Sequence, residues 1–297
     1  MQKITPHLWF DKEAKEAAEL YTSLLDGKIT NVTTLHNTPG GDADTVSFEL
    51  SGQSFMAISA GPLFKFNPSI SFHVKRKTED EVNKLWKELI DGGKALMELG
   101  GYPFSKRYGW LQDKYGLSWQ IIYVGDPPAG GEIKQKITPV IMYVGDVCGK
   151  AEEAVKFYTT TFKEAKIDFA QHYGKDEEPN KEGSLKYASF TLFGQEFGAM
   201  DGAGPHQFKF NEAISFIVKC EDQDEIDYYW EKLSSVPESE QCGWLKDKFG
   251  VSWQIVPSDM EKMMAKGTPE QMTRVTKAFL KMKKFIVSDL QKAFEGK

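Results

Sequence analysis

The sequence lacks the features of several large protein classes. It has only three cysteines in 297 residues, Cys148, Cys220 and Cys242, and none lies in a C-x-x-C pair. An odd count without paired spacing argues against a disulfide framework or a zinc knuckle and favours a reducing compartment. Because Asp11 interrupts the N-terminus before an apolar segment can form, we expect no signal peptide and a cytoplasmic protein.

Long apolar runs and positive charge are also scarce. No run approaches the roughly 18 apolar residues that a membrane-spanning helix needs. The net charge of −6 gives no general attraction to nucleic acid or to anionic lipid. The sequence contains no G-x-G-x-x-G after a strand, no Walker loop and no G-x-S-x-G elbow. We therefore expect no nucleic-acid or membrane partner, and no cradle for S-adenosylmethionine.

A long internal repeat is the strongest feature present. Three segments occur twice: Gly109–Ile122 with Gly243–Val256, Phe64–Phe72 with Phe208–Phe216, and Ile4–Pro6 with Ile137–Pro139. The period of about 133 residues is far longer than a solenoid unit, so each copy should be a domain. We predict domains at 1–126 and 133–257, a Pro/Gly-rich linker at 127–132, and a helical tail over 258–297.

Strand and helix periodicities alternate within each copy in the order β-α-β-β-β, repeated once. In the first copy, strand patterns cover 3–10, 28–36, 45–50, 54–59, 69–75, 95–99, 108–112 and 117–123. Helical patterns follow Ala14 and the capping box Thr78–Glu81. Asn67 and Trp110 are 43 positions apart, but Asn211 and Trp244 are only 33 apart, so a strand of the second copy should be shortened.

The tail begins after Pro257, and it contains a second capping box at Thr268–Gln271. Its apolar stripe consists of Met272, Val275, Phe279 and Met282 and continues through Ile286, Leu290 and Phe294. We expect this stripe to pack on the domains, with a partner-binding helix as the alternative.

The paired β-α-β-β-β units resemble the vicinal-oxygen-chelate (glyoxalase/bleomycin resistance/dioxygenase) superfamily. The motifs Phe-Asn-x-x-Ile-Ser-Phe and Gly-Trp-Leu-x-Asp-Lys-[Tyr/Phe]-Gly-x-Ser-Trp-Gln-Ile, each present twice, are similar to its PhnB-like branch. That branch often carries the label 3-demethylubiquinone-9 3-methyltransferase. The resemblance implies an α+β fold of two tandem glyoxalase-like domains, each with a curved sheet around a cleft and helices outside.

The resemblance also implies four inward metal-ligand positions per domain, usually His, Glu or Gln. These positions fall on Thr5, Ala57, Ser69 and Gln120 in the first copy and on Thr138, Ala199, Ala213 and Gln254 in the second. Hydroxyl, methyl and neutral amide groups are poor substitutes for imidazole or carboxylate. We therefore expect the fold and the cleft without the family's metal, and no other cofactor.

Strand alternation predicts which side chains line each cleft. If each copy encloses its own cleft, the first contains Thr5, His7, Trp9, Ser71, His73, Ser118 and Gln120, and the second contains Thr138, Val140, Met142, Ser215, Ile217, Ser252 and Gln254, with Asp201 at a strand end. Trp119 and Trp253 should face the helices, Asp113 and Asp247 should serve tight turns, and Trp110 and Trp244 stay undecided.

Two functions fit this pattern. The favoured interpretation is a protein that binds a small organic molecule without a metal, either as a pseudo-dimeric monomer or as a homodimer. The alternative is a lyase, isomerase or transferase that acts on a small metabolite in the first cleft, with His7 and His73 as acid and base or with a metal held outside the family geometry. For the two histidines themselves, the favoured interpretation is that they are ordinary cleft residues, hydrogen-bonded to serine or backbone.

Overall fold

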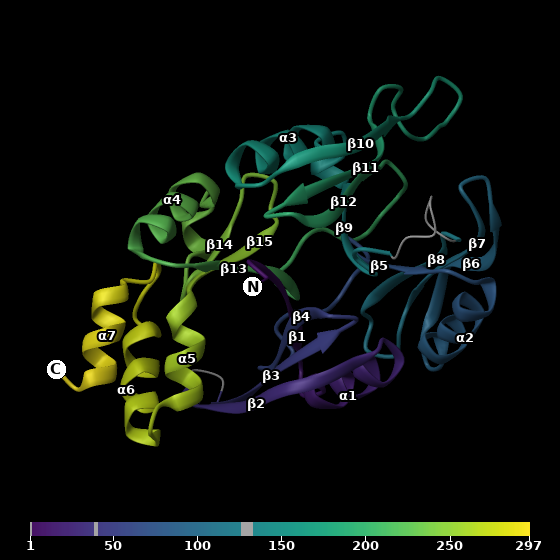
Figure 1. Ribbon diagram of the computed structural model, residues 1–297. Coiled ribbons are helices and arrows are strands. Elements are labelled where there is room, and N and C mark those ends of the chain that lie inside the picture. Colours follow the sequence, from purple (N-terminus) through teal and green to yellow (C-terminus); the bar gives the residue numbers. More distant parts are fainter. Residues whose placement is uncertain (1, 39–40, 126–132) are drawn as a thin grey trace.

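The computed structural model describes residues 2–38, 41–125 and 133–297 (Figure 1), so the predicted linker at 127–132 lies outside the described residues. The first repeat contains β1 (Ile4–Phe10), α1 (Ala14–Leu24), β2 (Gly27–Thr38), β3 (Gly41–Leu50), β4 (Gln53–Ser59), β5 (Ile70–Arg76), α2 (Glu79–Ile90), β6 (Lys94–Tyr102), β7 (Ser105–Gln112) and β8 (Ser118–Tyr123).

The second repeat contains β9 (Ile137–Val144), α3 (Ala151–Thr161), β10 (Lys166–His172), β11 (Leu185–Leu192), β12 (Gln195–Gly202), β13 (Ile214–Cys220), α4 (Gln223–Leu233), β14 (Trp244–Lys246) and β15 (Ser252–Pro257). The tail forms α5 (Ser258–Lys266), α6 (Pro269–Phe279) and α7 (Val287–Glu295). The predicted α+β class and the C-terminal helices are confirmed, and so is the β-α-β-β-β order in three of the four units; the last unit has only β14 and β15 after α4. None of the helices in the described ranges is both long and apolar enough to cross a bilayer.

The strands form two sheets, and each sheet takes strands from both repeats. Sheet A has the order β14-β15-β13-β1-β4-β3-β2, and sheet B has the order β10-β11-β12-β9-β5-β8-β7-β6. The repeats join where β1 runs antiparallel to β13 and where β5 runs antiparallel to β9. Both sheets curve, and α1 to α4 lie on their outer sides (Figure 1). The expectation that each repeat encloses its own cleft is therefore wrong, because β1 pairs with β13 of the other repeat.

Each repeat is held together across the two sheets by a buried carboxylate. In the first repeat, Tyr21 Oη and Trp119 Nε1 donate to Asp113 Oδ2 at 2.7 and 2.9 Å. The amides of Tyr115 and Leu117 donate to Asp113 Oδ1 at 2.9 and 3.0 Å, which closes the turn before β8. Burial raises the pKa of the Asp113 carboxyl, and the four donors oppose that rise.

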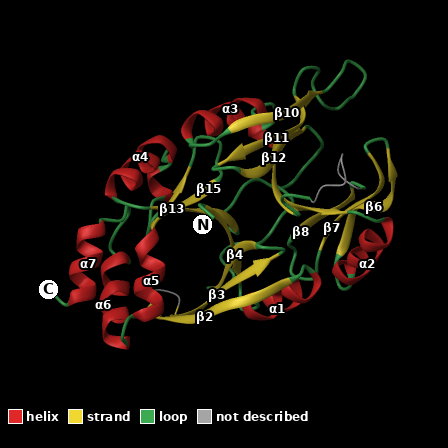
Figure 2. Cartoon of the chain, viewed as in Figure 1, coloured by secondary structure: helices red, strands yellow, loops and turns green. Residues whose placement is uncertain are grey.

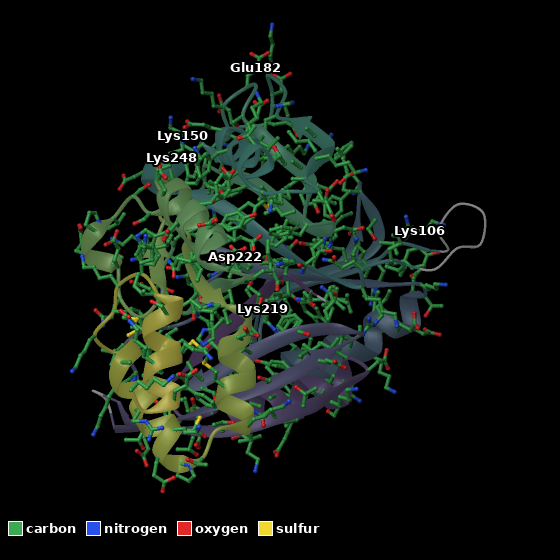
Figure 3. The ribbon with its side chains drawn as sticks, turned by 60° about the vertical axis from the view of Figure 1, so that its left-hand side comes forward. Lys106, Lys150, Glu182, Lys219, Asp222 and Lys248 are labelled. Atoms are coloured by element: carbon green, nitrogen blue, oxygen red, sulfur yellow. The ribbon has the colours of Figure 1, made fainter. Side chains whose placement is uncertain are left out.

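The second repeat reproduces this arrangement around Asp247. Tyr158 Oη and Trp253 Nε1 donate to its Oδ2 at 2.7 and 2.9 Å. A surface carboxylate, Glu153 of α3, also links α3 to the turn that contains Asp247. It accepts from Lys150 at 3.1 Å and from Lys248 at 2.8 Å, and Figure 3 shows these two lysines close together. The predicted turn role of Asp113 and Asp247 is confirmed, and both carboxylates also fix a tyrosine and a tryptophan.

The tail replaces a strand that the second repeat has lost. In the first repeat, β7 pairs with β6, where Tyr108 lies opposite Gly100. At the corresponding place in the second repeat, the amides of Cys242 and Gly243 donate to the carbonyls of Met282 and Lys283 at 2.8 and 2.7 Å. The predicted shortening is confirmed, since β14 has only three residues. The segment between α6 and α7 covers the edge that would otherwise be exposed.

The tail packs on sheet A through its own small core, as predicted (Figure 2). The buried side chains are Val275, Phe279, Phe285 and Leu290, with Cys242 and Val256 against them. The helix stops after Phe279, which shifts the register: Phe285 is buried, whereas Ile286 is 36% exposed. The prediction that Ile286 continues the stripe is therefore wrong. Gly243 has φ +83°, and a Cβ there would lie 2.6 Å from the Phe285 ring.

Candidate functional site on the inner sheet faces

The inner face of sheet A is built from three adjacent strands, β15, β13 and β1. Cross-strand pairing places Ser252, Ser215 and His7 in one row and Gln254, Ile217 and Thr5 in the next. Alternate residues of the same strands, Trp253, Phe216 and Leu8, are buried toward the helices. Six side chains from two repeats therefore share one inner surface.

Buried polar atoms without a hydrogen-bond partner concentrate on the inner faces. Among the described residues there are six such atoms, and five lie on these faces. Sheet A holds Thr5 Oγ1, His7 Nδ1 and Ser252 Oγ, sheet B holds both ring nitrogens of His73, and the sixth is the Tyr229 hydroxyl. Leaving such an atom unpaired costs about 1–3 kcal/mol, so each of these atoms needs a partner that the described side chains do not supply, either water or a bound molecule.

The three atoms of sheet A lie close enough to contact one small molecule. Ser252 is two strands away from His7, which corresponds to about 10 Å, and Thr5 is two residues along β1, or about 7 Å. His7 is only 4% exposed, and burial lowers its pKa to about 3. Its imidazole is therefore neutral near pH 7, with one nitrogen that donates and one that accepts.

Two tryptophans cover this face of sheet A. Trp244, which the sequence left undecided, lies edge-on to the His7 ring with centroids 5.4 Å apart. Trp9 contacts Trp244 at 6.3 Å, and its Nε1 donates to the Gly61 carbonyl at 2.8 Å. Trp244 is partly exposed, whereas His7 is buried.

Sheet B has the same architecture. Both sheets contain an amide–hydroxyl bond, which in sheet A runs from Gln254 Nε2 to Ser215 Oγ at 2.9 Å. Sheet B contains further bonds between its polar groups. Tyr108 Oη donates to Gln120 Oε1 at 2.7 Å, and Gln120 Nε2 donates to Ser71 Oγ at 2.7 Å. Trp110 Nε1 donates to Ser118 Oγ at 2.8 Å, which places this second undecided tryptophan on the inner face. Thr138 Oγ1 donates to Glu196 at 3.5 Å.

His73 is the exception in sheet B, because neither of its ring nitrogens has a partner. It lies in one row with Gln120 and Thr138. Burial, with a smaller contribution from the charge of Lys75, lowers its pKa to about 3. The ring is partly exposed, but both nitrogens are covered.

The structure thus groups the predicted site residues by sheet and not by sequence repeat. Sheet A brings Thr5, His7 and Trp9 together with Ser215 and Gln254. Sheet B combines the remaining inward residues, Ser71, His73, Ser118, Gln120, Thr138 and Met142. The prediction that His7 and His73 share a cleft is wrong, because they belong to different sheets. Alternation within a strand gives the face of each residue but not the partner strand.

Three predicted positions lie on the opposite face. Asp201 Oδ1 accepts from the amides of Gly149 and Ala151 at 2.7 and 3.1 Å, and its Oδ2 accepts from Leu185 at 2.9 Å, so it holds the start of α3. Ala57 pairs with Leu8, and Ala199 pairs with Ile141, both on the helix side. The placement of Asp201, Ala57 and Ala199 in a cleft is corrected accordingly.

The comparisons with known proteins agree with this architecture. The family model described as 3-demethylubiquinone-9 3-methyltransferase matches residues 2–122 and 135–256. The chain belongs to this family. A solved PhnB protein of the family from Bacillus cereus is 42% identical and covers 41% of this chain and 100% of its own, with a TM-score of 0.39.

The fold extends beyond the 3-demethylubiquinone-9 3-methyltransferase family. Glyoxalase I from Zea mays is 12% identical, covers 88% of this chain and 96% of its own, and has a TM-score of 0.55, which shows the glyoxalase fold alone. None of the curated proteins matches the chain.

The inward residues do not fit the metal that the fold implies. Within the described ranges, no three His, Cys, Asp or Glu side chains lie close enough together to hold an ion. The positions that correspond to the family's ligands carry hydroxyl, methyl or amide groups, and the Gln120 oxygen already accepts from Tyr108. Each inner face also has one imidazole, His7 or His73, but no carboxylate accompanies it among the described inward residues. Because this donor set matches neither zinc nor the harder divalent cations, we derive no chemical step through a metal.

Proposed function

We propose that the protein binds a small organic molecule on the inner face of sheet A without a metal. The observation that carries this proposal is the trio of unpartnered buried atoms, Thr5 Oγ1, His7 Nδ1 and Ser252 Oγ. The corresponding residues of sheet B support it by contrast: Thr138, which corresponds to Thr5, and Ser118, which corresponds to Ser252, both have hydrogen-bond partners. The joining of one unit from each repeat in sheet A is what two copies would achieve in a dimer.

The chemistry of the trio favours an uncharged, hydroxylated or carbonyl-bearing ligand with an apolar body. Two hydroxyls and a neutral imidazole can each donate or accept, but none carries a charge that would compensate a buried ion. The indoles of Trp9 and Trp244 supply the apolar wall. A ligand would thus hydrogen-bond to the sheet and pack against the two rings.

A thermal-shift screen of uncharged hydroxylated and carbonyl compounds tests the proposal. We expect at least one compound to raise the melting temperature of the native chain and to lose this effect in Thr5→Val and Ser252→Ala. The matched variants Thr138→Val and Ser118→Ala should retain the effect. A screen in which every stabilising compound acts equally on all four variants would refute a site on sheet A.

The alternative of an enzyme that uses His7 and His73 as an acid–base pair has lost its geometric basis. The two residues lie on different sheets: His7 pairs with Ser215, and His73 lies between Gln120 and Thr138. General acid–base catalysis needs both groups within hydrogen-bond reach of one substrate.

A further inference from the structure

The outermost strand of sheet A, β2, lies at an edge that carries no charge. In the part of the chain that the structure describes, β2 ends sheet A and β10 ends sheet B, and each pairs with a strand on one side only (Figure 1). From Ile29 to Leu35, β2 has no Asp, Glu, Lys or Arg. Edge strands usually carry such charges, because their outward amides and carbonyls otherwise pair with another chain.

The corresponding edge of sheet B has the charges that β2 lacks. Both strands contain a bulge at the same place, directly after Ile29 in β2 and directly after Ile167 in β10. The residue in the bulge is Thr30 in β2 but Asp168 in β10, where it forms an ion pair with Lys166 at 2.7 Å. The repeat therefore contains one charged and one uncharged version of the same edge.

The charges nearest to the uncharged edge are already engaged within the chain. Lys28 forms an ion pair with Glu49 at 3.2 Å, and Asp44 Oδ1 accepts from Thr34 Oγ1 at 2.6 Å. Val32, in the middle of the strand, is 46% exposed. A second strand of the same sequence would therefore meet valine, threonine and asparagine without like charges opposite one another.

The helix beside the edge also suits a second copy. α1 packs over β2 and β3, and Thr22 approaches the start of β2, since its Cα lies 3.0 Å from a Cβ built at Gly27. Lys15 and Glu19 share a face of α1 with Thr22 because they precede it by seven and three residues. A twofold axis at the edge would place two α1 helices about 10 Å apart, near the spacing of packed helices, with a charge of each sign on the facing sides.

We propose that β2 is the pairing edge of a homodimer, in which the β2 strands of two copies run antiparallel across a twofold axis at Val32. This register pairs Val32 with itself, Asn31 with Thr33 and Thr30 with Thr34, and such β-branched and hydroxyl pairs stabilise neighbouring strands. Because each copy uses the same surface, the contact closes with two chains. The two repeats join through other strands, so β2 remains available, and the proposal does not depend on a ligand of sheet A.

Sedimentation velocity of the full chain over a concentration series tests this dimer. We expect the native chain to show a monomer–dimer equilibrium. Val32→Lys places two ammonium groups opposite each other and should raise the dissociation constant of the dimer by about tenfold or more. Ala170→Lys is the matched control on β10, because Ala170 is exposed and pairs with Ala188 as Val32 pairs with Val46. It should leave the equilibrium unchanged.

Thr30→Asp is a second variant that the fold should tolerate, since Asp168 occupies the corresponding position of β10. It should also weaken the dimer. A native chain that stays monomeric at every concentration would overturn the proposal and leave this edge to a strand of another protein. A dimer that survives both Val32→Lys and Thr30→Asp, or one that Ala170→Lys weakens as much as Val32→Lys does, would overturn it as well.

Discussion

Sheets A and B share one architecture and differ in what their polar side chains do. In sheet B, Ser118 and Thr138 bond to Trp110 and Glu196. In sheet A, the corresponding Ser252 and Thr5 have no partner, and Trp244 packs on His7 instead. Duplicated positions with the same residue types have thus acquired different roles, so the residue type alone does not identify a binding position.

The two histidines show the same divergence. His7 of sheet A corresponds to Val140 of sheet B, and His73 of sheet B corresponds to Ile217 of sheet A. Each sheet therefore keeps one neutral imidazole, but in a different row. The imidazole therefore occupies a different position on each inner face, and either histidine can be substituted without altering the other face.

The largest effect we expect is a loss of folding stability in acid, to which a histidine in each sheet contributes. The folded-state pKa of each histidine is about 3, whereas the ordinary value is 6.5, so the unfolded chain binds more protons between these limits. Stability is fully present above pH 6.5 and is lost as the pH falls toward 3. Each histidine contributes about 1.4 kcal/mol per pH unit, so the pair accounts for about 5 kcal/mol at pH 4.5.

The residues of the opposite repeat supply matched variants for this pH effect. His7→Val and His73→Ile should each remove about half of the loss, and the double variant should remove nearly all of it. Urea unfolding measured from pH 7 to pH 4 gives the slopes. Unchanged slopes in both variants would show that the buried histidines do not control acid stability.

The tail covers the β14 edge of sheet A, whereas the corresponding edge of sheet B is covered by its own strand β6. Phe285→Ala tests how much the tail contributes to stability. Removing this buried ring should lower the free energy of unfolding by about 3–5 kcal/mol, as large core truncations do. Because Gly243 lies under the ring and precedes Trp244, tryptophan fluorescence should also report a more mobile Trp244. Phe104→Ala, an exposed residue beside sheet B, is the control and should change stability little.

The local structure was predictable from the sequence, and the long-range pairing was not. Capping boxes at Thr78 and Thr268 and the burial of Trp119 and Trp253 follow from signals within a few residues. Whether β1 joins β5 or β13 leaves the alternation of side chains unchanged, so the sequence pattern cannot distinguish them. Asp201 was misplaced for a related reason, since only the structure shows the amides of α3 that surround it.

Loss of a hydrogen-bond donor to the buried carboxylate should reduce stability by a similar amount in the two repeats, whereas the two inner faces should respond differently to matched substitutions. Tyr21→Phe and Tyr158→Phe each remove one donor from a buried aspartate, so each should lower the free energy of unfolding by about 1–3 kcal/mol. Urea unfolding of both variants measures the two losses. A loss confined to one repeat would show that the two carboxylate networks are not equivalent.

The most direct test compares the free energy of unfolding of Ser252→Ala with that of Ser118→Ala in the ligand-free protein. Ser252 Oγ is buried without a partner, so its removal should stabilise the protein by about 1 kcal/mol, whereas Ser118→Ala removes the partner of Trp110 and should destabilise it by a similar amount. Opposite signs would support the proposal that a ligand supplies the missing partner of Ser252. Destabilisation of similar size in both variants would contradict it.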